Sequence, residues 1–185
     1  MRGKLRMLCI MLAIMPIGVF AQEVKESKVK IGRDHKDGYV AMSRHGSAAI
    51  KNVIETKFKN AGLGKRSTKK GFRTYKGAVW PAVSTNKMDV YYRVKGNSRK
   101  CKVYLVASKG YDNYITGATD AAASTNIITF LQSLDRQAEL DEQIGAKQAE
   151  LKTLDEKAKE ADKQKKEAEE SRKQTQKQIR QLQDK

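Results

Sequence analysis

Hydrophobic and polar residues alternate along three segments in the middle of the chain, and this alternation predicts β-strands at 71–83, 88–95 and 102–108. In the second segment Val90, Tyr92 and Val94 alternate with polar or charged residues. Because successive side chains of a strand point to opposite sides, one side of this strand is apolar and the other polar. Residues 96–98 (Gly-Asn-Ser) are typical of a hairpin connection to the third strand.

Two shorter strands and a helix are predicted before these segments. The strands lie at 28–31 and 38–42, and the composition of 34–38 is typical of a turn between them. Ser47 is positioned to cap the helix, which ends at the glycine-containing segment 60–64. The apolar residues of this helix follow helical spacing: Ile50, Val53, Ile54 and Phe58.

A second helical pattern begins near Asp120, and its apolar stripe consists of Ile127, Phe130, Leu131, Leu134 and Ala138. From Asp120 to Lys185 there is no proline and a single glycine, Gly145. At 1.5 Å per residue, an uninterrupted helix would be on the order of 100 Å long. The predicted fold class is therefore α+β: a small antiparallel sheet with a helix packed on one face and the other face in water, followed by a long C-terminal helix of coiled-coil type.

The last fifty residues fit a heptad repeat with position a at 137 and position d at 140. The apolar residues at these positions form what we call the seam: Leu140, Ile144, Leu151, Leu154, Ala158, Ala161, Ala168, Ile179 and Leu182. A 3.5-residue repeat favours pairing with another helix, and small residues with lysine in the seam favour two strands. The alanines bury little area, and Lys147, Lys165 and Arg172 place charges in the seam, so we expect modest association. Three alternatives remain open: a homodimer, docking to a partner helix, and a single helix in water.

Charge divides the chain near residue 135. The protein has 185 residues with 38 Lys+Arg and 21 Asp+Glu, a net charge of +17. Residues 22–135 hold 22 Lys+Arg and 9 Asp+Glu, a net of +13, whereas 136–185 hold 13 and 12, a net of +1. All aromatic residues after Phe20 lie in the first part. The sequence therefore predicts a basic α+β domain at 22–135 and a charged helical stalk at 136–185.

Residues 1–21 are typical of a secretory signal. Three cations in the first six residues precede an apolar run from Met7 to Phe20, and Ala21 is a small residue before a cleavage point. The run is shorter than the ~20 residues that a membrane-spanning helix needs. We expect export to the periplasm or the exterior. Whether this segment is cleaved or kept as an anchor stays open.

Ten basic residues are the candidate anion contacts. They are Lys65, Arg66, Lys69, Lys70, Arg73, Lys76, Arg93, Lys95, Arg99 and Lys100, with Lys102 beside them. If the strands are neighbours, these groups converge on one end or on the open face of the sheet and attract phosphates. The alternative is that the lysines keep strand edges and turns soluble.

No catalytic, cofactor or metal site is predicted. The histidines, His35 and His45, lack metal-ligand spacing, and the nine acidic residues of the basic domain are scattered. Cys101 lies in an alternating segment, where it is expected to be a buried hydrophobe and not a nucleophile.

These features favour a non-enzymatic adaptor or structural protein of the cell envelope, with a basic head on a stalk that forms oligomers or docks to a helical partner. The main alternative is a module that binds an anionic polymer, meaning lipid phosphate, an envelope polymer or, least favoured of these, nucleic acid. A small hydrolase is the least favoured class.

Overall fold

The computed structural model describes residues 23–183, and the predicted signal at 1–21 lies outside this range. In chain order the elements are β1 (Val24–Ile31), β2 (Asp34–Ser43), α1 (Ser47–Asn60), β3 (Arg66–Lys69), β4 (Phe72–Trp80), β5 (Ser84–Gly96), β6 (Cys101–Ser108) and α2 (Ala121–Gln183). The predicted α+β class, with an antiparallel sheet and a long C-terminal helix, is confirmed.

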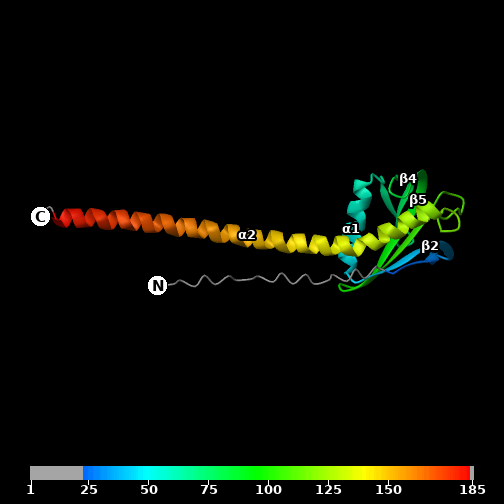
Figure 1. Ribbon diagram of the computed structural model, residues 1–185, viewed down its shortest axis with the longest axis horizontal. Helices are drawn as coiled ribbons and strands as arrows, with labels where there is room; N and C mark the ends of the chain where they lie inside the picture. The colour runs from blue at the N-terminus through cyan, green and yellow to red at the C-terminus, as the bar shows by residue number, and fades with distance from the viewer. Residues whose placement is uncertain (1–22, 184–185) are drawn as a thin grey trace, which may run out of the picture.

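The six strands form one antiparallel sheet in the order β1-β2-β6-β5-β4-β3. Helix α1 and the first part of α2 pack against each other and cover one face of the sheet. Helix α2 then leaves the head and continues as a single rod to Gln183 (Figure 1). Together with the strands, α1 and the start of α2 make up the head.

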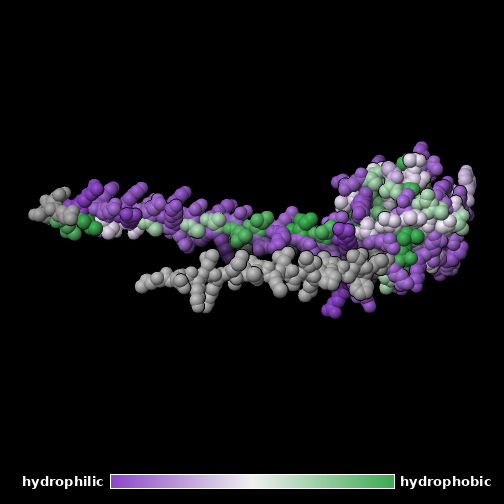
Figure 2. Space-filling model, viewed as in Figure 1, coloured by the Kyte–Doolittle hydropathy of each residue, from purple (hydrophilic) through white to green (hydrophobic). Residues whose placement is uncertain are grey.

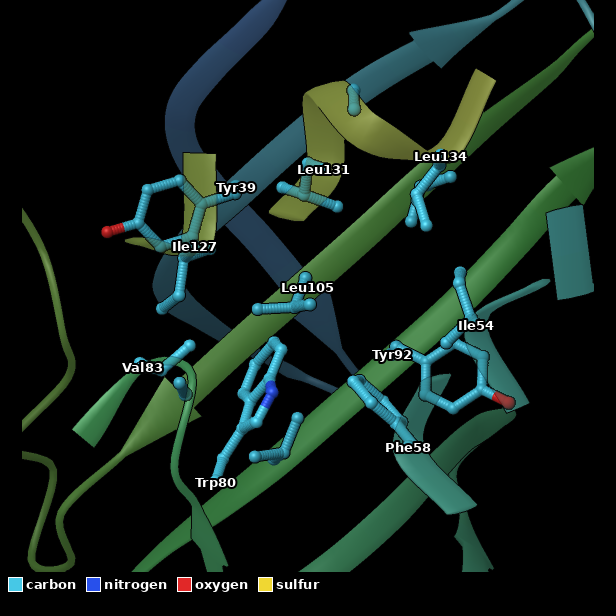
Figure 3. Packing of buried hydrophobic residues seen from close by; sticks show 14 of the residues in the cluster. Tyr39, Ile54, Phe58, Trp80, Val83, Tyr92, Leu105, Ile127, Leu131 and Leu134 are labelled. Carbon is cyan, nitrogen blue, oxygen red and sulfur yellow. The ribbon is translucent and has the colours of Figure 1, made fainter. Parts of the chain in front are cut away.

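The main hydrophobic core lies between the helices and the sheet. Phe58 of α1 meets the rings of Tyr75, Trp80, Tyr92 and Phe130 at centroid distances of 5.0 to 5.5 Å. Figure 3 shows Phe58, Trp80 and Tyr92 pointing into the same layer as leucines of β6 and α2. The predicted apolar positions of both helices lie in this layer, so helical spacing identified the correct faces.

The second face of the sheet differs from the prediction, because its centre is not in water. Val29, Ile31, Phe72 and Val106 are almost completely buried there in a separate cluster. The tips of the β1–β2 and β3–β4 hairpins meet above this cluster. The Lys70 ammonium is 3.8 Å from the Asp34 carboxylate, and the Lys70 side chain packs on Gly32. Sheet twist, which brings diagonal corners together, accounts for this closure.

Two local predictions were wrong, and one strand was missed. The turn between the first two strands is at Gly32-Arg33, and residues 34–38 belong to β2 because each pairs with a residue of β1. The N-cap of α1 is Gly46 and makes no side-chain capping bond, while Ser47 is the first helical residue. Strand β3 was not predicted, since its four residues are polar and exposed and give no alternation.

Helix α2 is capped by Asp120, whose carboxylate accepts a hydrogen bond from the backbone N–H of Ala123 at 3.1 Å. The last buried residue of α2 is Ala138, one turn before the His45 ring meets the Glu142 carboxylate at 3.4 Å. From residue 139 to 182 every side chain is exposed, and the helix runs through Gly145 without a break. We call residues 139–183 the stalk.

Candidate functional site

Seven basic residues gather at one end of the second face of the sheet, and we call them the cationic face. They are Lys69, Lys70, Arg93, Lys95, Arg99, Lys100 and Lys102. The strand register brings them together: Lys69 opposes Phe72, Arg93 opposes Tyr104, and Lys95 opposes Lys102. Arg99 and Lys100 lie in the β5–β6 turn, where their backbone N–H groups donate to the Asn97 side chain.

The cationic face has almost no internal counter-charge. Among the residues that the structure describes, only Lys70 of this group has an acidic neighbour, Asp34. Lys95 and Lys102 are directly opposite each other on adjacent strands, an arrangement that destabilises a sheet unless an anion lies between the charges. The site therefore carries a positive field that is not neutralised from within.

Arg93 is the centre of this surface. Its guanidinium lies over two rings, 4.4 Å from the centroid of Phe72 and 5.3 Å from that of Tyr104. Its Nε is buried and has no hydrogen-bond partner in the described part of the chain. The two rings hold the guanidinium in one orientation, in which the Nε donor has no acceptor. Such a fork matches the oxygens of a phosphate or carboxylate.

Arg66 and Arg73, two of the predicted anion contacts, lie on the opposite face of the sheet. Both form ion pairs with Glu55 of α1, Arg66 at 2.8 Å. The Tyr92 hydroxyl donates to the same carboxylate at 3.2 Å, and burial raises the pKa of Tyr92 to about 12. This cluster joins α1 to the sheet, so the two arginines stabilise the fold and are not available to a ligand on the cationic face.

Lys65 and Lys76, also predicted, are outside the cationic face. Lys76 forms an ion pair with Asp89 at 3.3 Å beside the irregular pairing of β4 with β5. Burial acts to raise the pKa of Asp89, but hydrogen bonds from Gly77, Tyr91 and Lys76 outweigh it and lower the pKa. Lys65 precedes β3 and is exposed. The ten predicted residues thus separate into a clustered group and a structural or isolated one.

The aromatic partners of Arg93 were not predicted from the sequence. For Tyr104 a signal was present in the alternation of Lys102 and Tyr104 along β6, which places both on one side of the strand. The position of Phe72 had no comparable signal, because it depends on how β4 aligns with β5.

A shallow pocket of about 350 Å³ lies on the other side of the sheet. It is lined by Glu55, Thr56, Phe58, Lys59, Gly64, Arg66 and Tyr75. Glu55 is the single carboxylate of this lining, and it is already bound by two arginines and a tyrosine. The lining therefore lacks the pair of carboxylates that general acid–base catalysis often uses.

Residues 23–183 contain no cluster of three or more His, Cys, Asp or Glu that could hold a metal ion. Cys101 is buried, as predicted, and burial raises the pKa of its thiol, which disfavours the reactive thiolate.

A second polar cluster connects β2 to the loop before α2. The Lys36 ammonium donates to the Tyr114 hydroxyl at 2.5 Å and to Asp112 at 3.0 Å, and Tyr114 in turn donates to Asp112. These hydrogen bonds, the one to Tyr114 first, raise the pKa of Lys36 and keep the lysine charged. The charges of Lys36 and Asp112 are thus paired within the cluster, and these contacts hold the loop against β2.

The stalk offers a surface of a different kind. Leu140, Ile144, Leu151, Leu154, Ile179 and Leu182 of the seam are between 42 and 72% exposed. Figure 2 shows hydrophobic side chains in patches along the stalk between longer hydrophilic stretches. Only two ion pairs form along it within the described chain, Lys147–Glu150 and Lys163–Glu167. Local pairs of this type contribute ~0.2–0.5 kcal/mol each, too little to fix a helix of this length alone.

The chain matches no protein-family model, no curated protein and no solved structure. Within residues 23–183, neither helix has an apolar stretch of the length and hydropathy that crossing a bilayer requires. Function is therefore inferred from the cationic face and the stalk themselves.

Proposed function

We propose that the protein is a non-enzymatic, exported adaptor of the cell envelope, in which the stalk pairs with another helix and the head provides the contact surface. One observation carries the proposal: the stalk leaves the head with large apolar side chains exposed along it, and no other part of the described chain covers them. Exposed apolar residues that repeat along a helix favour association, because pairing removes their area from water. Export rests on the sequence of residues 1–21 alone.

The stalk's own pairing is tested by a double substitution in the seam, Leu151→Gln with Leu154→Gln. We expect the unaltered protein to be a dimer whose population rises with concentration, and the variant to dissociate about a thousandfold more readily. In a dimer four leucines lose contact; at about 1 kcal/mol each, half of the value for full burial, the loss is about 4 kcal/mol. Sedimentation equilibrium of the full chain measures the dissociation constant.

The control for this experiment is Thr153→Gln, an exposed substitution between the two leucines that lies outside the seam. It should leave the dissociation constant unchanged. If the unaltered protein is monomeric at every accessible concentration, self-association is excluded, and pull-down with the intact chain and its double variant becomes the test of docking to a partner helix.

Anion binding by the cationic face is the second candidate function, favoured by the stacked and unpaired Arg93. The chemistry fits phosphate groups of lipids or envelope polymers, and less specifically the nucleic-acid backbone. Because the cations are exposed, we expect binding to weaken strongly as salt is added.

The triple variant Lys95→Gln, Lys100→Gln, Lys102→Gln is expected to bind vesicles containing phosphatidylglycerol about a hundredfold more weakly than the unaltered protein. Each cation near an anionic surface contributes about 1 kcal/mol, and 1.4 kcal/mol is a factor of ten. The matched control replaces Lys51, Lys57 and Lys59, which belong to α1 on the other side of the sheet. Equal losses for both triples in a sedimentation assay would show that net charge alone is responsible and would dismiss the cationic face.

A further inference from the structure

The stalk carries opposite charges in its two halves. Residues 139–162, next to the head, contain four Lys or Arg and eight Asp or Glu, a net charge of −4. Residues 163–183, toward the C-terminus, contain seven Lys or Arg and three Asp or Glu, a net charge of +4. A second copy placed parallel would set like halves side by side, whereas an antiparallel copy would set each half against its complement.

We propose that the stalk binds a second copy of this chain in an antiparallel two-helix coiled coil centred near residues 159 and 160. This inference rests on the proposed function, since it specifies how the stalk pairs. The two heads then lie at opposite ends of the dimer. A parallel dimer would bring two domains of net charge +13 next to each other, at a cost that rises as salt falls.

The flanks of the seam agree with the antiparallel arrangement. Heptad position e holds acids: Asp141, Asp155 and Asp162 in the half near the head, and Glu169 beyond it. Position b holds cations in both halves: Lys152, Lys159, Lys166, Lys173 and Arg180. Positions b and e lie on the same flank of a helix, and in an antiparallel pair this flank faces its counterpart on the partner. Asp141 then lies between Lys173 and Arg180 of the second copy, within reach of both long side chains.

The seam itself also favours this direction. In the centred register Leu151 faces Ala168 and Ile144 faces Thr175, so that large residues meet small ones at these two levels. Ala158 faces Ala161 at the centre, and Leu140 faces Ile179 near the ends. A parallel pair would instead stack Lys165 on Lys165. The antiparallel register moves that lysine next to a leucine but leaves Lys147 opposite Arg172, which keeps the association modest.

The space and the area for a second copy are present. Ala138 and Glu142 of α2 turn toward the head, whereas Leu140 is exposed, so the seam is open up to the edge of the head. Pairing over residues 139–183 covers a strip about 65 Å long and about 10 Å wide on each helix. The total of about 1,300 Å² is within the range of specific protein interfaces.

Distances between spin labels in the full-length dimer test the direction. Cys9 is replaced by serine, the buried Cys101 is kept, and a label is attached at Gln181→Cys or, in a separate protein, at Thr153→Cys. In the antiparallel dimer the two labels at 181 are separated by 43 residues of helix, about 65 Å, and those at 153 by 13 residues, about 20 Å. In a parallel dimer both positions give the short spacing between neighbouring helices, about 10 Å between axes.

A long distance at 181 with a short one at 153 supports the proposal. Short distances at both positions overturn it while leaving the stalk's role in pairing intact. A chain that stays monomeric at all concentrations overturns both the antiparallel dimer and self-association through the stalk, so the two failures are distinguishable.

Charge reversal gives a second readout that needs no label. A variant with Asp141 and Asp155 changed to Lys, and another with Lys166, Lys173 and Arg180 changed to Glu, should each dissociate at least tenfold more readily than the unaltered dimer. Mixed in equal amounts, they should form a heterodimer, because every reversed acid then faces a reversed base. No gain in association on mixing would contradict the antiparallel contact of these flanks.

Discussion

A chain that ends after Asp120 is expected not to fold, whereas a chain that ends after Gly145 should unfold at the same temperature as the whole protein. The first truncation removes five buried residues of α2 from the core: Ala123, Ile127, Leu131, Leu134 and Ala138. Burial of each of the three larger side chains contributes about 1.5–3 kcal/mol, and together they match much of the 5–15 kcal/mol that a domain of this size has. Circular dichroism during heating and in urea measures both chains.

The longer truncation is the control, because the residues that it removes up to 182 are all exposed and it keeps the contact between His45 and Glu142. A cooperative transition near the original temperature in the chain that ends at Asp120 would contradict the assignment of α2 to the head. The result also bears on the predicted division at residue 135. The net charge of the sequence drops after residue 135, but the last buried residue of α2 is Ala138, three residues later. A chain cut at 135 would therefore lose one residue of the core.

The sequence predicted elements well wherever one face of an element is buried and the other is not. Val90, Tyr92 and Val94 of β5, and the apolar stripes of α1 and α2, show the expected period because the core selects the residues on one side. Strand β3 lacked this signal: its side chains are exposed on both sides, and only backbone pairing with β4 makes it a strand.

The first turn shows how pairing overrides local composition. Residues 34–38 have turn composition, yet each pairs with a residue of β1, and the chain reverses two residues earlier at Gly32, whose φ of 69° suits a glycine. The second face shows the same limit at longer range. Phe72 is buried by contacts with β1 across the twist of the whole sheet, which no local pattern encodes.

Only part of the site could be predicted for a related reason. Clusters of Lys and Arg are visible in a sequence, but their availability depends on which acids the fold brings to them. Glu55 lies on α1, more than ten residues from Arg66 and Arg73, and still neutralises both. Lys95 and Lys102 have no such acidic neighbour in the described chain. The positive charge of the basic hairpin is therefore not neutralised, whereas part of that of the basic segment at 65–76 is.

Replacement of Phe58 by alanine is expected to lower the free energy of unfolding by about 3–5 kcal/mol, a large share of the stability of a small domain. The ring is fully buried at the centre of the core and contacts four other aromatic rings, three edge-on and that of Phe130 stacked at an interplanar angle of 11°. Its loss leaves a cavity between α1, α2 and the sheet in addition to the lost transfer free energy. Urea titration followed by tryptophan fluorescence measures the change, since Trp80 is one of the four neighbours.

Two variants sharpen this measurement. Phe58→Leu keeps most of the apolar contact and should cost less than half as much, which separates the aromatic contacts and cavity from simple burial. Thr56→Ala, on the exposed side of the same helix, should change stability by no more than about 0.5 kcal/mol. If Phe58→Ala lowered the free energy of unfolding as little as Thr56→Ala, the ring would not be the contact that joins both helices to the sheet. The contacts that fix the start of α2 would then have to lie elsewhere in the head.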